Sequence, residues 1–143
     1  MIVIDVNLLI YAVNHDSPEH EKAKSWLQTT VSGTETIGLP WIVLLAFLRL
    51  TTRPGLFQKP LSVDSAFELV DAWLQQPTVT VPEPTARHLQ TMRDLISPLG
   101  TAGNLTSDAY LAALAIEHGA ELCSTDNDFG RFNRLRWRNP LGR

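Results

Sequence analysis

The sequence predicts an α/β fold whose central sheet is mainly parallel and has four to five strands. Short apolar runs bounded by turn residues alternate with longer segments in which apolar residues recur at helical spacing. The segments between successive strands are long enough for the crossover helices that parallel pairing requires. At 143 residues the chain fits one domain with a genuine core, so we interpret residues 1–143 as a single domain.

The first half of the chain opens on a buried strand. Met1–Ile4 is apolar, and Asp5 ends the run. Ser17-Pro18 has the capping residue and first-turn proline of a helix start. The segment after Pro40 is apolar nearly all round, with Arg49 as its one charge, and is therefore expected to be buried. The expected elements are a helix at 8–13, a helix from 17 to 33, a strand at 36–39 and a helix at 42–50.

The second half repeats the alternation after a loop at 51–60. The helix that begins at Ser62 is expected to turn Ala66, Phe67, Val70, Trp73 and Leu74 inward. Gly119 follows the last helix at the position where a left-handed residue ends a helix. The other expected elements are a strand at 79–81, a helix marked by residues 89–96, a helix at 107–118, a strand at 121–125 and a short strand at 135–137.

Composition and charge exclude several classes of protein. No apolar run approaches membrane-spanning length, and the N-terminus lacks the basic region of a signal peptide. The single cysteine, Cys123, excludes an internal disulfide and fits a reducing compartment, so a cytoplasmic protein without membrane contact is expected. The formal net charge is −3, yet after Asp128 the chain carries only basic charges, at Arg131, Arg134, Arg136, Arg138 and Arg143. This tail either attracts phosphate or is an ordinary solvated terminus.

Carboxylates stand in three places where core residues would be expected. Asp5 ends the first strand, Asp126 and Asp128 follow the fourth, and Asp108 lies in the first turn of an apolar helix. If these strands are parallel neighbours, a right-handed crossover brings all three places to the carboxyl edge of the sheet. Each acid also has a local alternative: a helix cap for Asp5, a helix-dipole partner for Asp108 and an Asx turn for Asp126.

Converging carboxylates require a cation to remain ionised at neutral pH. Oxygen ligands suit Mg²⁺ or Mn²⁺, which also take phosphate oxygens and can activate water, so the pattern favours metal-dependent phosphodiester hydrolysis. The four histidines lack zinc-like spacing, and no glycine loop with Gly-Lys-Ser/Thr is present. Phosphoryl-aspartate chemistry needs a late lysine, whereas the lysines here are Lys22, Lys24 and Lys59. A two-carboxylate glycosidase remains a remote alternative.

The ordered set of motifs resembles the PIN domain, and more closely the VapC toxins of bacterial toxin–antitoxin pairs. The resemblance spans essentially the whole chain. It rests on Asp5-Val6-Asn7, Leu39-Pro40-Trp41, Phe47-Leu48-Arg49 with Thr51-Thr52-Arg53-Pro54, Gly103-Asn104-Leu105 leading to Asp108, Leu111–Gly119, and Ser124-Thr125-Asp126-Asn127-Asp128-Phe129.

The resemblance implies a three-layer α/β/α fold and an endoribonuclease that depends on Mg²⁺ or Mn²⁺. It also implies a cognate VapB-type antitoxin and a homodimer. By matching position, Asp5, Asp108 and Asp126 would hold the metal, and Asp128 would be a further member of the catalytic group. Asn7 and Thr125 would orient those carboxylates or the attacking water.

One position departs from the family pattern. Many PIN domains carry a glutamate three residues before the arginine that corresponds to Arg49, and Ala46 stands there in this chain. The absence of that acid is expected to weaken a second metal position. It also leaves open an alternative function, a catalytically weak module that binds RNA or a partner. Arg49 is either a structural ion-pair partner or a phosphate contact, and the candidate RNA-binding residues are Arg49, Arg134, Arg136 and Arg138.

Overall fold

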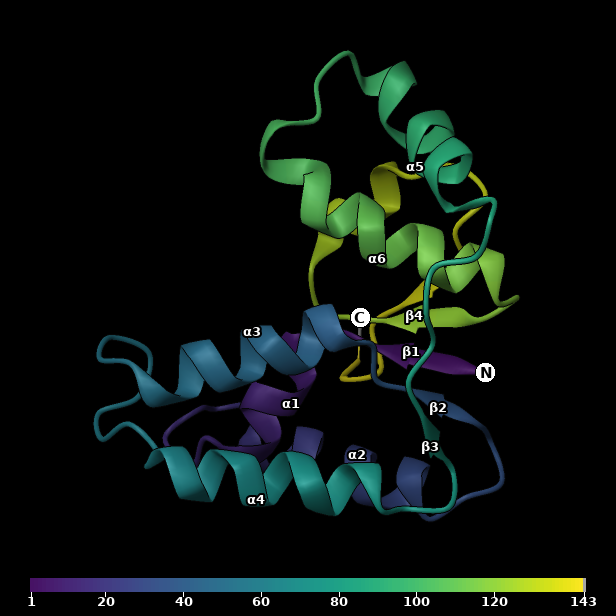
Figure 1. The fold of residues 1–143 in the computed structure, drawn as a ribbon. Helices are drawn as coiled ribbons and strands as arrows, with labels where there is room; N and C mark the ends of the chain where they lie inside the picture. Colours follow the sequence, from purple (N-terminus) through teal and green to yellow (C-terminus); the bar gives the residue numbers. More distant parts are fainter. Residues whose placement is uncertain (143) are drawn as a thin grey trace.

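The computed structural model describes residues 1–142, and Figure 1 shows how the helices lie on the two sides of the central sheet. The elements are, in chain order, β1 (Ile2–Ile4), α1 (Val6–Val13), α2 (His20–Val31), β2 (Ile37–Gly38), α3 (Trp41–Thr52), α4 (Val63–Leu74), β3 (Val79–Thr80), α5 (His88–Ile96), η1 (Ser97–Leu99), η2 (Gly103–Leu105), α6 (Thr106–Glu117), β4 (Glu121–Cys123), η3 (Asn127–Arg131) and β5 (Trp137–Arg138).

All strand pairs in the sheet are parallel, and the strand order is β3-β2-β1-β4-β5. This confirms the predicted α/β class and the expected four to five strands. β1 lies between β2 and β4, and Val3 and Ile4 are completely buried. A strand covered on both faces reads as a continuous apolar run, which is why residues 1–4 were recognisable.

The chain leaves β1 in one direction and later returns on its other side. β1, β2 and β3 follow one another outward, and the chain then crosses back so that β4 pairs with the free edge of β1. Right-handed crossovers in opposite directions place α1 to α4 on one face and α5 with α6 on the other, in three layers (Figure 1). The carboxyl ends of β1 and β4 therefore meet at a topological switch point, where open α/β sheets bind ligands.

Several boundaries differ from the sequence-based expectation. α1 begins at Val6 and not at Leu8, because the carboxylate of Asp5 caps the N–H of Val6. α3 is not buried all round, since Trp41 and Leu45 are 50% and 60% exposed. The expected inward position of Phe67 on α4 was wrong, as that side chain is 55% exposed.

Other expectations hold closely. Gly119 has a φ of 63° and lies just after the C-cap of α6, in the left-handed conformation that was predicted for it.

α3 and α4 run side by side beyond the carboxyl ends of the strands, so α3 forms one wall beside the switch point (Figure 1). Among residues 1–142, no helix is long and apolar enough to cross a membrane.

Candidate functional site

Asp5 occupies the switch point at the end of β1. It is the N-cap of α1, and its Oδ1 accepts a hydrogen bond of 2.7 Å from the N–H of Val6. Its Oδ2 accepts a second bond of 2.7 Å from the hydroxyl of Ser124. The helix-cap interpretation and the site interpretation therefore describe the same side chain, because the cap holds the carboxylate at the end of the sheet.

Ser124 connects the two strand ends, and the sequence analysis gave it no role in the site although it begins the motif that contains Asp126. Its side chain is completely buried. Besides donating to Asp5, its Oγ accepts from Nδ2 of Asn7 at 3.3 Å and from the N–H of Asp126 at 3.0 Å. No side-chain hydrogen bond of Thr125 is recorded within residues 1–142. The one available signal was that Ser124 is the first polar residue after the apolar end of β4.

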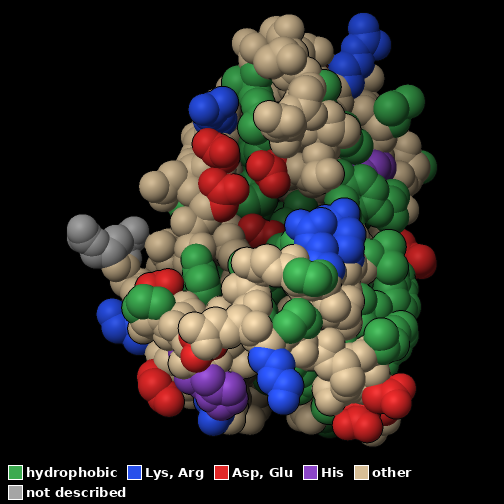
Figure 2. All heavy atoms as spheres, turned by 90° about the vertical axis from the view of Figure 1, so that its left-hand side faces the viewer, with side chains coloured by type: hydrophobic (Ala, Val, Ile, Leu, Met, Phe, Trp, Pro, Cys, Tyr) green, Lys and Arg blue, Asp and Glu red, His purple; other side chains and the backbone are tan. Residues whose placement is uncertain are grey.

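Three further carboxylates gather next to this pair of strand ends. Asp108 lies in the first turn of α6, and Asp126 is the N-cap of η3. Oδ1 of Asp126 accepts from the N–H of Asp128 at 2.9 Å, so the Asx-type turn considered as the local alternative for Asp126 is present within the acidic group. One carboxylate oxygen from each of Asp108, Asp126 and Asp128 lies within 4.8 Å of the others. Figure 2 shows acidic side chains gathered on this face of the molecule, with basic side chains beside them.

The crowding raises the pKa of two of these carboxyl groups. Burial raises the pKa of Asp5, although the bonds from Ser124 and Val6 work in the opposite direction, and the nearby charge of Asp126 adds to the increase. Burial also raises the pKa of Asp108 to about 6, with further contributions from the charges of Asp126, Asp5 and Asp128. A group of acids that resists full ionisation is one that a cation would stabilise.

The donor set fits a hard divalent cation. It consists of carboxylate oxygens from Asp108, Asp126 and Asp128, with Asp5 beside them and no sulfur or imidazole ligand in the group. Asn7 adds an amide oxygen, Oδ1, that is buried and has no hydrogen-bond partner among the described residues. Such an oxygen calls for a bound water or ion, because an unpaired buried acceptor is costly. The residues present therefore fit Mg²⁺ or Mn²⁺.

A small cavity adjoins the carboxylates on the side of α3. Its volume is about 120 Å³. Ala46 lines it, so the position where many PIN domains carry an acid is open and apolar in this chain. The remaining lining residues are Asp5, Val6, Ile42, Val43, Ser107, Asp108 and Leu111.

The arginines predicted to bind RNA do not lie together. Arg49 is exposed on α3, with no ion pair recorded within residues 1–142, so the structural ion pair considered for it is not observed there. It follows Ala46 by three residues and therefore shares the face of α3 that lines the cavity. The tail arginines are held elsewhere, and Arg143 lies outside the described residues. Their partners are Asp94 for Arg134 at 3.7 Å, the carbonyl oxygen of Gly119 for Arg136 at 2.8 Å, and Glu121 for Arg138 at 3.1 Å.

The partners of Arg136 and Arg138 hold their guanidinium groups toward the start of β4, although the backbone of Arg138 pairs with Cys123 at its end. Gly119 and Glu121 lie at the start of β4, whereas Asp126 follows its end. Arg131 is the exception, because its guanidinium lies 3.7 Å from the carboxylate of Asp128. That pair is exposed, so it adds little to stability but does place one positive charge at the rim.

Comparison with known protein families gives one match over most of the chain. The PIN-domain family matches residues 2–135. Ribonuclease VapC37 of Mycobacterium tuberculosis is 44% identical over 140 residues, which cover 98% of this chain and 97% of that protein. Ribonuclease VapC33 of the same species is also 44% identical, over 99% of both chains.

Solved structures share the fold at lower identity. The chain aligns with VapBC2 from Rickettsia felis, whose structure is described as bound to a DNA fragment from their promoter, at a TM-score of 0.71 and 21% identity. That alignment covers 97% of this chain and 98% of the other. FitAcB from Neisseria gonorrhoeae aligns at a TM-score of 0.61 and 21% identity, over 98% of both chains. At these identities the likeness establishes the fold.

Proposed function

The chain belongs to the PIN-domain family, and on that basis we propose that it is a metal-dependent endoribonuclease toxin that hydrolyses RNA phosphodiester bonds. The observation that carries the proposal is the meeting of Asp108, Asp126 and Asp128 within 4.8 Å at the switch point, beside Asp5. The 44% identity to proteins named Ribonuclease VapC supports the choice of RNA as the substrate. We treat residues 1–143 as one PIN domain.

Four carboxylates would form the metal-binding and catalytic group of the site. Asp5, Asp108 and Asp126 would hold Mg²⁺ or Mn²⁺, and Asp128 would complete the acidic rim. A divalent ion held there neutralises charge on a phosphate and makes water a better nucleophile at neutral pH. Without metal the pKa of Asp108 is raised to about 6, so protons would compete with a cation for this carboxylate close to neutral pH.

The neighbouring polar residues position these acids. Ser124 holds Asp5 and the backbone of Asp126 with one hydroxyl, so the two strand ends keep a fixed separation. Asn7 donates to Ser124, and its buried Oδ1, which has no hydrogen-bond partner among the described residues, would accept from a bound water or contact the ion. Thr125 remains a proposed second orienting residue. Arg49 would contact a phosphate from α3, and we assign Arg134, Arg136 and Arg138 a smaller part in RNA binding, because local partners hold them.

The proposal includes a protein inhibitor. Relatives of this fold were solved as assemblies described as VapBC, which supports a VapB-type antitoxin for this chain. We also propose that the toxin forms a homodimer. An acidic rim with raised pKa values attracts a basic side chain, which would compete with a cation for the same oxygens. We place the protein in the cytoplasm, with its RNA substrate and the reducing conditions that a free, buried Cys123 tolerates.

The test is cleavage of host RNA by the purified protein with Mg²⁺, with Mn²⁺ and with a chelator. The wild type should cut RNA only with metal, and Asp108→Asn should lose cleavage while keeping its fold by circular dichroism. Asp64→Asn is the matched control, because Asp64 is an exposed acid in the first turn of α4 and is not one of the rim acids. Cleavage that persists in chelator or in Asp108→Asn would overturn the mechanism.

The alternative, a binding module without catalysis, has its own signature. A cation that binds the folded state raises the melting temperature according to its concentration relative to Kd. RNA binding with neither metal stabilisation nor cleavage would favour that alternative, which Ala46 first suggested.

A further inference from the structure

The cavity beside the carboxylates has walls of two kinds. Val6, Ile42 and Ala46 are among the apolar residues that form most of its lining, and Asp5 and Asp108 are its two acidic residues. The Ser107 hydroxyl adds a polar group that can both donate and accept. The cavity is therefore a small apolar recess that opens directly beside charged groups.

This composition limits what can enter the recess. A phosphate would be repelled by the two carboxylates. An ammonium or guanidinium would be attracted to those carboxylates at the rim, but further into the recess the apolar walls offer its charge few hydrogen bonds. An uncharged group with apolar faces and polar edges meets neither penalty. The volume of about 120 Å³ lies well below the roughly 300 Å³ at which sites for drug-sized ligands begin, so one ring fits and a whole nucleotide does not.

The recess is continuous with the acidic rim. Asp108 lines the cavity and also belongs to the carboxylate group that would face a phosphate. Arg49 lies one helical turn beyond Ala46 on the same face of α3, where it can meet a neighbouring phosphate. A ring in the recess would thus lie between two phosphate positions, as a base does in an RNA strand.

We propose that this recess, opened by Ala46 in place of an acid, binds the base of an unpaired nucleotide next to the phosphate that is cut, and that it favours single-ring pyrimidines. This inference rests on the proposed function and adds a substrate class to it. A base can enter such a recess only from a loop or single strand, because stacked and paired bases are not available. Ala46 and Ile42 are then specificity-determining residues.

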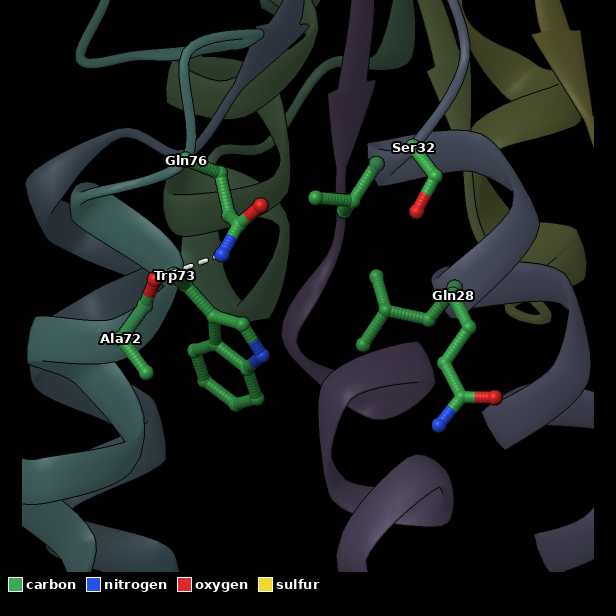
Figure 3. Close-up of a pocket in the computed structure, with 7 residues that line it drawn as sticks. Gln28, Ser32, Ala72, Trp73 and Gln76 are labelled. Carbon is green, nitrogen blue, oxygen red and sulfur yellow. Dashed lines mark hydrogen bonds between the residues drawn. The ribbon is translucent and has the colours of Figure 1, made fainter.

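A second cavity provides a control for the test. It lies between α2 and α4 and has a volume of about 220 Å³, with Trp73 and Ala72 on the α4 side and Gln28 on the α2 side (Figure 3). Its lining contains no charged residue and none of the rim acids. Ala72→Leu there introduces the same side chain as Ala46→Leu without touching the recess.

The experiment follows methyl NMR signals during titration with Mg²⁺ and one of five probes: the four nucleoside 5′-monophosphates and ribose 5-phosphate. The nucleotides, and the pyrimidines most strongly, should shift the methyl signals of Ala46, Ile42 and Leu111, whereas ribose 5-phosphate, which lacks a base, should not. Ala46→Leu should weaken nucleotide binding about tenfold or more and leave ribose 5-phosphate unaffected, because the lost interaction is that of the base. Ala72→Leu should match the wild type.

A second variant guards against a folding defect in the first. Ile42→Ala enlarges the recess and should reduce the preference for pyrimidines over purines. Equal shifts with ribose 5-phosphate and with nucleotides, or an unchanged base preference in both Ala46→Leu and Ile42→Ala, would overturn the proposal. So would an Ala46→Leu protein that binds nucleotides normally but binds its protein inhibitor less tightly, because the recess would then serve an apolar side chain.

The result can be separated from the test of the proposed function, because NMR reads binding without cleavage. Base-dependent shifts in a protein that cuts no RNA would overturn the proposed nuclease function and support base binding in the recess. Metal-dependent cleavage without base-dependent shifts would support the nuclease function and overturn base binding in the recess.

Discussion

The hydroxyl of Ser124 donates a hydrogen bond of 2.7 Å to Oδ2 of Asp5, although 119 positions separate them in the chain. The same oxygen accepts from the N–H of Asp126 and from Asn7, so one small side chain connects the ends of β1 and β4. Because Ser124 is completely buried, water cannot readily replace these bonds.

Ser124→Ala should therefore loosen the acids without unfolding the protein. We expect metal affinity to fall about 10- to 100-fold, as for other residues that orient ligands. Removing the hydroxyl should also lower the free energy of unfolding by about 1–3 kcal/mol. Calorimetric titration with Mn²⁺ measures the first effect and urea unfolding the second. Ser25→Ala, at an exposed position of α2, is the control. Unchanged Mn²⁺ affinity in Ser124→Ala would show that Asp5 needs no such support.

The residues around Ser124 also show what could be predicted from the sequence. Asp5 and Asp126 follow apolar strands and Asp108 opens an apolar helix, so chain direction in a parallel sheet was enough to bring them to one edge. The choice between Ser124 and Thr125 as the linking hydroxyl depends on where β4 ends. Strand alternation alone cannot locate that end, and β4 stops at Cys123, two residues earlier than expected.

The surface was less predictable than the core. Phe67 and Leu45 continue helical apolar patterns, yet both are exposed, because α3 and α4 extend past the strands and have no layer on their outer sides. The position of the tail arginines could not be predicted for another reason. The chain turns back after η3, with a positive φ of 72° at Arg134, and β5 then runs parallel to β4. Charge counting cannot detect that reversal, which carries Arg136 to the start of β4.

The raised pKa of Asp108 predicts how stability depends on pH in the metal-free protein. Its folded pKa is about 6 and its reference value is 3.8, so the folded state binds a proton more readily than the unfolded chain. The resulting stabilisation is complete below about 3.8 and is lost as the pH rises through 6. In chelator, the melting temperature should therefore rise between pH 7.5 and pH 5.

Asp108→Asn is the matching variant for this pH series, because its side chain cannot titrate. The increase in melting temperature toward low pH should be smaller in Asp108→Asn. Asp5 should account for the remaining increase, because burial also raises its pKa. In the wild type, stabilisation by Mn²⁺ should shrink over the same range, because protons compete for the same oxygens. A melting temperature that is equally pH-dependent in both proteins would assign the effect to other groups.

A buried pair at the far end of α6 predicts a stability effect that is independent of metal. The Glu117 carboxylate is 1% exposed, pairs with His88 and accepts two hydrogen bonds from Thr85, which joins the start of α5 to α6. Burial alone would raise the pKa of Glu117, but the bonds from Thr85 and His88 outweigh it, and the pKa is lowered. Glu117→Ala leaves Thr85 and His88 without this partner and should lower the free energy of unfolding by roughly 3 kcal/mol.

Urea unfolding at pH 7 measures that loss, with the exposed Glu68→Ala as its control. A lowered pKa gives stability that is present above the reference value of 4.5 and is lost as the pH falls through the folded value. The difference between wild type and Glu117→Ala should therefore narrow below about pH 4.5. If Glu117→Ala lowers the free energy of unfolding by less than about 1 kcal/mol at pH 7, water must form the hydrogen bonds that the carboxylate made to its partners.

The two kinds of arginine predict different salt dependences of RNA binding. Arg49 is exposed near the recess, whereas Arg138 is bonded to Glu121. Each phosphate contact releases counterions, so losing one should reduce the slope of log affinity against log salt by about 0.7 for a single strand. Arg49→Gln should show this reduction in full, and Arg138→Gln should reduce the slope by a smaller amount, because Glu121 already holds the Arg138 guanidinium. Fluorescence anisotropy with a labelled oligoribonucleotide over a salt series measures both. A reduced slope in Arg138→Gln alone would mean that RNA follows the tail along β4 and β5, away from α3.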